Sequence, residues 1–207
     1  MRSRLVRLAH GWTLLRSPFL SESLLREFIR PAVRAMPSSM ALRLGLCQIS
    51  FSAETDPGVS SRWTETDAGL EVEVMTGESP EHDLAMELLV CLGQALWERL
   101  SEAEFQEYWL LLAREMRDGI KGEIDELALQ QKRCLLASPL LARSSRQLAR
   151  YGRASFAGTA AEYVHCLWHD VTARTGPDYL PAQQLRRRLE LVAGWFPPDR
   201  GYRLFAN

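Results

Sequence analysis

Two histidines near the end of the chain have the spacing of metal ligands. His165 and His169 lie four residues apart, so one helical turn would place both on the same face, and Asp170 follows directly. Imidazole pairs at this spacing bind Zn²⁺ when further ligands complete the site. The sequence offers no evident third ligand. An enzyme or metal site built around these three residues is therefore kept as an alternative hypothesis.

Other side chains with reactive groups favour structural roles. Cys91 could act as a nucleophile, but its neighbours are apolar, and burial of that kind raises a thiol pKa and lowers reactivity. His82 and Asp83 are interpreted as a pair that caps a helix. The run Arg186–Arg188 is interpreted as a solvated helix face. The acids at 123, 125 and 126 fit the first turn of a helix, and no calcium site is predicted from them.

An apolar stretch in the middle of the chain reads LLVCLGQALW over residues 88–97. It resembles the active-site helix of zincin metallopeptidases, in which the local pattern is commonly LLHELGHALW. In that family the two histidines bind one zinc ion, and the glutamate activates the metal-bound water. Val90 and Gln94 stand here at the histidine positions, and Cys91 stands at the glutamate position.

A second segment, residues 150–163, extends the resemblance. It reads RYGRASFAGTAAEY and is similar to the downstream segment of zincins such as the catalytic domain of anthrax toxin lethal factor. There a Tyr-Gly-Arg run precedes a helix whose first glutamate is the third zinc ligand, and a second glutamate lies behind it. The resemblance places Gly158 at the ligand position and Glu162 at the position behind it. It places Tyr151 where a tyrosine assists the oxyanion.

The resemblance implies a zincin-like protein that has lost its metal and its catalysis. With Val90, Cys91, Gln94 and Gly158 at the vestigial metal and catalytic positions, we predict no catalytic residues, no bound metal and no cofactor. Valine has no lone pair to offer a metal, and a glutamine amide is a poor zinc ligand. The protein is therefore expected to be an inactive homologue of a metallopeptidase rather than an enzyme.

A cleft between the sheet edge and the central helix is the predicted functional surface. Peptidases of this fold bind substrate as an added strand along the sheet edge, and main-chain hydrogen bonds of that kind do not need zinc. We therefore predict a peptide or protein partner and a binding or regulatory role, with Tyr151 and Glu162 as further cleft residues. The alternatives are the enzyme around His165, His169 and Asp170, or an unrelated helical interaction domain.

Composition and length indicate one soluble globular domain. The chain has 207 residues, of which 46% are hydrophobic and 25% charged. The apolar stretches are too short and too often interrupted by charge to cross a membrane. Four cysteines without a CxxC pair favour a reducing compartment. Because Arg7, His10 and Arg16 interrupt the N-terminal apolar stretch, it fails as a signal peptide, and a cytoplasmic location is predicted.

The net charge of −1 hides an uneven distribution. Residues 1–46 hold eight basic and two acidic residues, 47–130 hold five and nineteen, and 131–207 hold twelve and five. Only Lys121 and Lys132 are lysine, which indicates a bacterial-type composition. The sequence shows no basic patch interleaved with aromatic residues, so no nucleic-acid or membrane partner is predicted.

Hydrophobic periodicity predicts the elements that position these residues. Residues 1–20 are expected to form an arm or short helix. Residues 21–78 are expected to hold a helix interrupted by Pro31, extended segments at 41–52 and 62–66, a turn at 67–69 and a strand at 70–75. Residues 79–207 are predicted to be helical. Expected helices run over 83–100, 101 to about 118, 123–137, 140–150, 159–171 and 181–195, with capping boxes at Ser101/Glu104 and Thr159/Glu162.

The predicted fold class is α+β in one domain, residues 1–207. A zincin-like arrangement is expected, with an N-terminal helix, a small and mostly antiparallel sheet, a buried central helix and further C-terminal helices. The helix over 83–100 is hydrophobic nearly all round, which is typical of a buried element.

Overall fold

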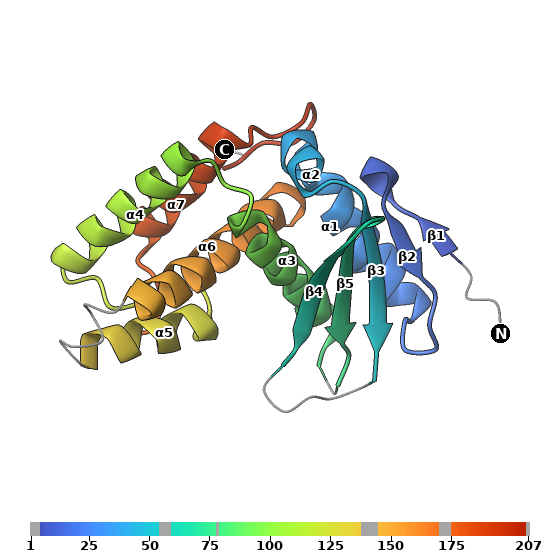
Figure 1. The fold of residues 1–207 in the computed structure, drawn as a ribbon, viewed down its shortest axis with the longest axis horizontal. Helices are drawn as coiled ribbons and strands as arrows, with labels where there is room; N and C mark the ends of the chain where they lie inside the picture. The colour runs from blue at the N-terminus through green and yellow to red at the C-terminus, as the bar shows by residue number, and fades with distance from the viewer. Residues whose placement is uncertain (1–4, 54–58, 78, 138–144, 170–174, 206–207) are drawn as a thin grey trace.

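A computed structural model describes residues 5–53, 59–77, 79–137, 145–169 and 175–205. The described chain is an α+β fold, with a five-stranded sheet on one side and most of the helices on the other (Figure 1). Its elements, in chain order, are β1 (Leu5–Arg7), η1 (Ala9–Gly11), β2 (Thr13–Leu15), η2 (Leu24–Ile29), α1 (Arg30–Ala35), α2 (Ser38–Leu44), β3 (Cys47–Ser52), β4 (Ser61–Thr66), β5 (Gly69–Met75), α3 (Glu81–Trp97), α4 (Glu102–Arg117), α5 (Glu126–Ala137), α6 (Ser145–Trp168) and α7 (Ala182–Trp195).

The sheet is mixed, with strand order β1-β2-β3-β5-β4. The outer pairs β1–β2 and β4–β5 are antiparallel, whereas β2–β3 and β3–β5 are parallel. The prediction of a mostly antiparallel sheet is therefore wrong. The tight hairpin between β4 and β5 is antiparallel as expected, but the chain leaves β3 for the sheet edge and returns through β5. That path makes β5 parallel to β3.

One face of the sheet carries the apolar side chains. Leu70, Val72 and Val74 of β5 alternate with Glu71 and Glu73, and only the apolar set is fully buried. The predicted strand at 70–75 and the turn before it are confirmed.

The N-terminal part differs from the prediction in two places. Residues 5–15 form two short strands joined by a 3₁₀ turn, not a helix. The segment 41–52 is extended only from Cys47, because Ser38–Leu44 is helical and Gly45 ends that helix at φ 76°. The predicted interruption by Pro31 appears only as a change of helix type, since π-helical turns over Leu24–Ile29 give way to an α-helix that begins at Arg30 without a non-helical residue between them.

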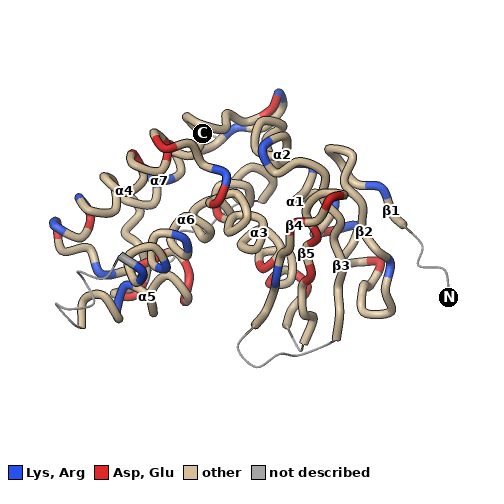
Figure 2. The backbone as a smooth tube through the Cα atoms, in the orientation of Figure 1, with Lys and Arg blue, Asp and Glu red and all other residues tan. Residues whose placement is uncertain are grey.

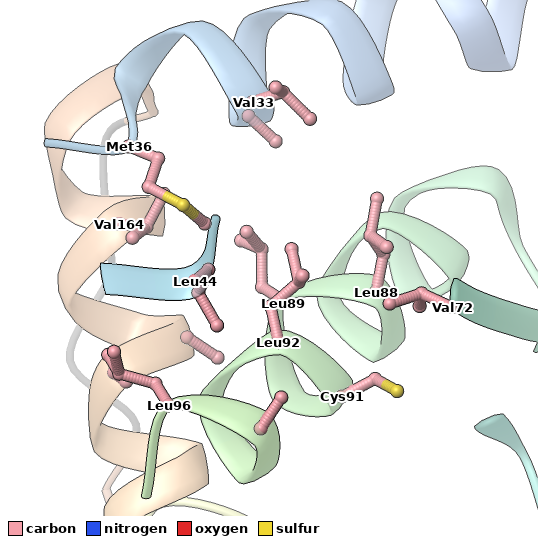
Figure 3. Packing of buried hydrophobic residues seen from close by; sticks show 14 of the residues in the cluster. Val33, Met36, Leu44, Val72, Leu88, Leu89, Cys91, Leu92, Leu96 and Val164 are labelled. Carbon is pink, nitrogen blue, oxygen red and sulfur yellow. The ribbon is translucent and has the colours of Figure 1, made fainter. Parts of the chain in front are cut away.

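Helix α3 is the centre of the molecule, as predicted. Leu88, Leu89, Leu92 and Trp97 are buried, and Figure 3 shows the leucines packed among side chains from neighbouring elements. Helix α6 crosses α3 closely at Gly93, where a Cβ atom would lie 2.8 Å from the backbone oxygen of Ala157. The glycine of the LLVCLGQALW segment therefore sets the α3–α6 distance.

Helix α6 is longer than predicted. Its 24 residues run from Ser145 through Gly152 to Trp168, so Thr159 lies inside the helix and the predicted Thr159/Glu162 capping box is wrong. Thr159 instead donates to the backbone oxygen of Ser155. The helix continues through Gly152, where the ring of Trp109 lies 2.5 Å from the place of a Cβ and leaves no room for a larger side chain.

The other predicted helices compare well with the structure. The Ser101/Glu104 capping box and the helix after Pro181 are confirmed. The predicted helix over 140–150 lies partly outside the described residues. No helix in the described part of the chain has the length and apolar character to span a membrane.

Candidate functional site

A cleft of about 860 Å³ lies where the sheet edge meets the helices. Its walls come from the start of β4, one face of α3, the second half of α6, the segment entering α5 and residues 179–185. The lining residues are Val59, Ser60, Ser61, His82, Asp83, Met86, Glu87, Val90, Gln94, Glu123, Ile124, Asp125, Glu126, Leu127, Gln130, Gly158, Ala161, Glu162, His165, His169, Tyr179, Leu180 and Leu185.

Four of the six predicted site residues line this cleft. Val90 and Gln94 reach it from α3, and Gly158 and Glu162 reach it from α6. Residues that are 64 or more positions apart in the sequence are thereby brought to one cavity. The sequence predicts a cleft between the sheet edge and the central helix, and this cavity lies at that place.

Cys91 does not line the cleft. Its side chain is fully buried, and Figure 3 shows the sulfur pointing away from α6, toward the side of the strands. Burial raises the pKa of the Cys91 thiol to about 12, which leaves it protonated at neutral pH. The expectation that the Cys91 thiol is buried is therefore confirmed, and its raised pKa agrees with the expected low reactivity.

Tyr151, predicted as a cleft residue, is fully buried behind the cleft wall, so that prediction is wrong. Its hydroxyl donates to Glu123 Oε1 at 2.6 Å. The reason is the length of α6: Tyr151 is an interior helical residue two turns before Gly158, not part of a loop that ends at the site.

The space at Gly158 is occupied by the side chain of Asp125. A Cβ atom built on Gly158 would lie 1.9 Å from Asp125 Oδ2. A glutamate at position 158, as the zincin resemblance would require for a zinc ligand, cannot coexist with Asp125 in this position. A carboxylate therefore still occupies this part of the cavity, but it comes from the segment before α5.

Asp125 is an N-terminal capping residue with an unsatisfied second oxygen. Its Oδ1 accepts from the backbone N–H of Ala128 at 2.8 Å, while the buried Oδ2 has no hydrogen-bond partner among the described residues. Burial raises the pKa of Asp125 to about 6, although the backbone donors oppose the shift.

Behind this wall lies a closed cluster of buried charges. Arg188 bonds to Glu115 and Glu123, and Lys132 bonds to Glu123 at 3.0 Å. Burial alone would raise the pKa of Glu123, but the two cations and the Tyr151 hydroxyl outweigh it and lower the pKa to about 2. The interpretation of Arg186–Arg188 as a solvated face is correct for the first two residues and wrong for Arg188, which is fully buried.

Carboxylates dominate the charge of the cleft lining. Six acidic residues line it, at 83, 87, 123, 125, 126 and 162, and no Lys or Arg stands among the described lining residues. Acidic positions also gather around β4, β5 and α3 in Figure 2. Glu123 is neutralised from behind by the buried cations, so the other five give the cavity its negative potential.

Strand β4 presents a free edge at the cleft. The backbone N–H of Met75 donates to the oxygen of Ser60, and antiparallel pairs alternate between bonded and non-bonded. Ser61 and Trp63 therefore direct their backbone N–H and C=O groups away from β5. Because β4 is the last strand of the sheet in the described part of the chain, no described strand pairs with these groups.

Three histidines meet at one end of the cleft. The ring of His82, in the first turn of α3, lies 5.1 Å from that of His165 and 5.9 Å from that of His169. His82 does not cap the helix as predicted, because Pro80 is the capping residue and has no side-chain donor or acceptor. Asp170, the third member of the predicted alternative, lies outside the described residues.

Sequence reasoning missed His82 and Asp125 as site residues. Both stand at the starts of helices, where a local capping role explains them sufficiently, and the long-range contacts of the fold are not visible there. The excess of nineteen acidic over five basic residues in 47–130 was the one available signal for an acidic cleft.

Comparison with known proteins identifies no relative. No protein-family model, no curated protein and no solved structure matches the chain significantly. Among the described residues, no three His, Cys, Asp or Glu side chains already converge on one metal position.

Proposed function

We propose that the protein is a zincin-like, non-catalytic binding protein that holds an extended peptide segment with basic side chains against the free edge of β4. The single observation that carries the proposal is the combination of an open strand edge with an acidic cleft of about 860 Å³. An added strand would take its main-chain hydrogen bonds from Ser61 and Trp63.

The zincin-like part of the proposal rests on three placements. Val90, Gln94 and Gly158 line one cavity, α3 packs against both the sheet and α6, and the strand beside the cavity is an antiparallel edge strand. None of the three lining residues supplies a good zinc ligand, which supports binding without hydrolysis.

Selectivity for a basic segment follows from the lining charges. Glu87 on α3 accepts from the Ser61 hydroxyl at the β4 edge, and Asp125 and Glu126 at the start of α5 line the same cavity. A Lys or Arg side chain that enters there meets several carboxylates without a competing cation. Glu or Asp at the same position would be repelled.

The experiment is a binding titration with short labelled peptides, followed by fluorescence anisotropy at low salt. The probes are alternating Thr-Val peptides that differ only in a central Lys, Arg or Glu. We expect the Lys and Arg peptides to bind at least about 10-fold more tightly than the Glu peptide, and the difference to shrink with added salt. Equal binding of the three peptides would contradict the proposal.

Main-chain pairing is tested from both sides of the interface. A Lys peptide with N-methyl groups on alternate amides cannot add as a strand and should lose about 10-fold or more in affinity. Ser61→Pro removes an outward-facing N–H and should weaken binding similarly, since a proline is tolerated at an edge. Ser61→Ala is the matched control, because it keeps the N–H and removes only the hydroxyl that bonds to Glu87.

The zincin-like geometry is tested by rebuilding the metal site. The variant Val90→His, Gln94→His, Gly158→Glu should gain a zinc site that the wild type lacks only when Asp125→Gly is added, because Asp125 fills the space of the new glutamate. The gain is counted as one Zn²⁺ more per chain than the wild type binds under the same conditions. The matched control is the triple variant that retains Asp125. If the quadruple variant folds and isothermal titration shows no gain in zinc affinity over the triple variant, the alignment to zincins is wrong. Cys91 is left unchanged, since it faces the sheet.

A further inference from the structure

The histidine end of the cleft contains a pair of rings that face each other through the same nitrogen. His82 Nε2 and His165 Nε2 lie 3.2 Å apart, one from the first turn of α3 and one from the last turn of α6. His165 is almost fully buried, whereas the side chain of His82 is about one-third exposed. The contact joins residues 83 positions apart.

Each ring has a carboxylate behind its other nitrogen. Asp83 Oδ1 lies 3.4 Å from His82 Nδ1, and Glu162 Oε2 lies 3.7 Å from His165 Nδ1. The second distance is too long for a hydrogen bond, and His165 Nδ1 is buried without another partner among the described residues. In both rings the nearby negative charge favours the proton on Nδ1.

The two Nε2 atoms either share one proton in a hydrogen bond or, when Nδ1 carries the proton in both rings, turn two lone pairs toward each other. With Nδ1 protonated in each neutral ring, both Nε2 atoms are acceptors, and two acceptors at 3.2 Å repel unless a cation lies between them. Two nitrogen ligands of a tetrahedral Zn²⁺, each about 2.0–2.1 Å from the metal, are about 3.3–3.4 Å apart. The observed separation is close to that value.

From this geometry we infer that a Zn²⁺ ion binds between His82 Nε2 and His165 Nε2, with His169 as the third ligand and the fourth position open to the cleft. Carboxylates behind ligating imidazoles, as Asp83 and Glu162 are here, fix the tautomer and raise the basicity of the ligand nitrogen. Borderline-soft imidazole donors suit Zn²⁺ better than Mg²⁺ or Ca²⁺.

His169 completes the site by turning its side chain. Its ring is exposed and lies 5.3 Å from that of His165, and its backbone N–H donates to the oxygen of His165 at 3.0 Å. The two residues thus stand one helical turn apart, a spacing at which two imidazoles reach one zinc ion. The third ligand is not yet aimed at the metal, consistent with the lack of a preformed three-ligand group in the described residues.

The inferred zinc site is separate from the position that corresponds to the zincin metal. Gly158 and His165 are seven residues apart on α6, which is about 10 Å along the helix axis. The inference therefore does not depend on the zincin resemblance or on peptide binding.

The test is a zinc titration of untagged protein that has been stripped with a chelator and transferred to chelator-free buffer. Isothermal titration should give one Zn²⁺ per chain, and saturating Zn²⁺ should raise the melting temperature by mass action. His82→Gln should weaken binding at least about 100-fold, and Asp83→Asn about 10-fold with the stoichiometry unchanged. His10→Gln is the matched control, since His10 contacts the backbone of Val33 far from the cleft and should not change the affinity.

Co²⁺ substitution adds a readout of geometry. The visible spectrum should report four-coordinate Co²⁺ in the wild type and lose that signature in His82→Gln. Circular dichroism and the metal-free melting temperature establish that each variant is folded. Absence of one-to-one binding at micromolar zinc, unchanged affinity in folded His82→Gln, or a six-coordinate Co²⁺ spectrum would overturn the inference. So would a proton shared between the two Nε2 atoms, seen by NMR, that persists with excess zinc. Peptide titrations are run without metal, so the two proposals fail independently.

Discussion

Glu123 and Asp125 are two residues apart and both border the cleft, yet their environments are opposite. Glu123 is surrounded by Arg188, Lys132 and the Tyr151 hydroxyl, and its pKa falls to about 2. Asp125 has backbone donors on one oxygen only, and burial raises its pKa to about 6. The charged form of Glu123 therefore stabilises the fold, whereas the charged form of Asp125 destabilises it.

The difference separates groups that hold the fold from groups that remain available to a ligand. In the charge cluster around Arg188, each described carboxylate and cation is paired within the protein. On the cleft side, Asp125 Oδ2 and His165 Nδ1 are buried without hydrogen-bond partners among the described residues. Buried polar atoms normally have partners, so unsatisfied atoms that border a cavity indicate a place where a ligand or ion can complete the bonding.

The largest expected effect is a loss of stability when the buried charge cluster around Arg188 is broken. Arg188→Met leaves Glu115 and Glu123 buried without their main cation, and we expect a loss of about 3–5 kcal/mol in the free energy of unfolding. Urea denaturation measures it. Arg186→Met on the same helix is the matched control, because Arg186 pairs with Glu190 at the surface and should cost less than about 0.5 kcal/mol. Similar losses in the two variants would show that the buried cluster has no special role.

A smaller effect is expected where the cleft wall is closely packed. Gly158→Ala forces Asp125 to move, and we expect a cost of about 1–3 kcal/mol. In an Asp125→Gly background the same alanine should cost less, because the obstructing carboxylate is gone. A double-mutant cycle by urea denaturation measures this coupling. Additive effects would mean that Asp125 does not occupy the space at Gly158.

The sequence predicts the local elements of this site better than its contacts. The buried α3, the Ser101/Glu104 cap and the β4–β5 hairpin follow from periodicity and turn chemistry, which act over a few residues. The sequence predicts a helix end at the glycine inside α6, because the close contact of that glycine with Trp109, on another helix, is not visible in the local sequence. The approach of Asp125 to Gly158, and of His82 to His165, is likewise a tertiary contact without a local signal.

The smallest expected effect is a change in pH dependence at Asp125. Its folded-state pKa of about 6 lies above the ordinary value of 3.8, so the folded protein holds the proton more tightly than the unfolded chain. This residue therefore makes stability fall as pH rises from about 4 through 6, and the full penalty is present above pH 6. Glu123 has the opposite dependence, since its contribution is present above about 4.5 and is lost as pH falls through about 2.

Asp125→Asn removes the ionisable group and can keep the capping oxygen. Removal of the buried charge stabilises the fold, but the new amide NH₂ group is buried without a partner and offsets part of that stabilisation. We therefore expect the variant to be about 1 kcal/mol more stable than the wild type near pH 7.5. That advantage should disappear near pH 4, where the wild-type carboxyl is protonated in the folded state. Urea denaturation of both proteins at intervals between these pH values measures the difference. Leu127→Ala, an exposed neighbour without a titratable group, should retain the wild-type pH profile. If the difference in the free energy of unfolding between the Asn variant and the wild type is the same at every pH in this range, Asp125 is solvated and not held in the cleft wall.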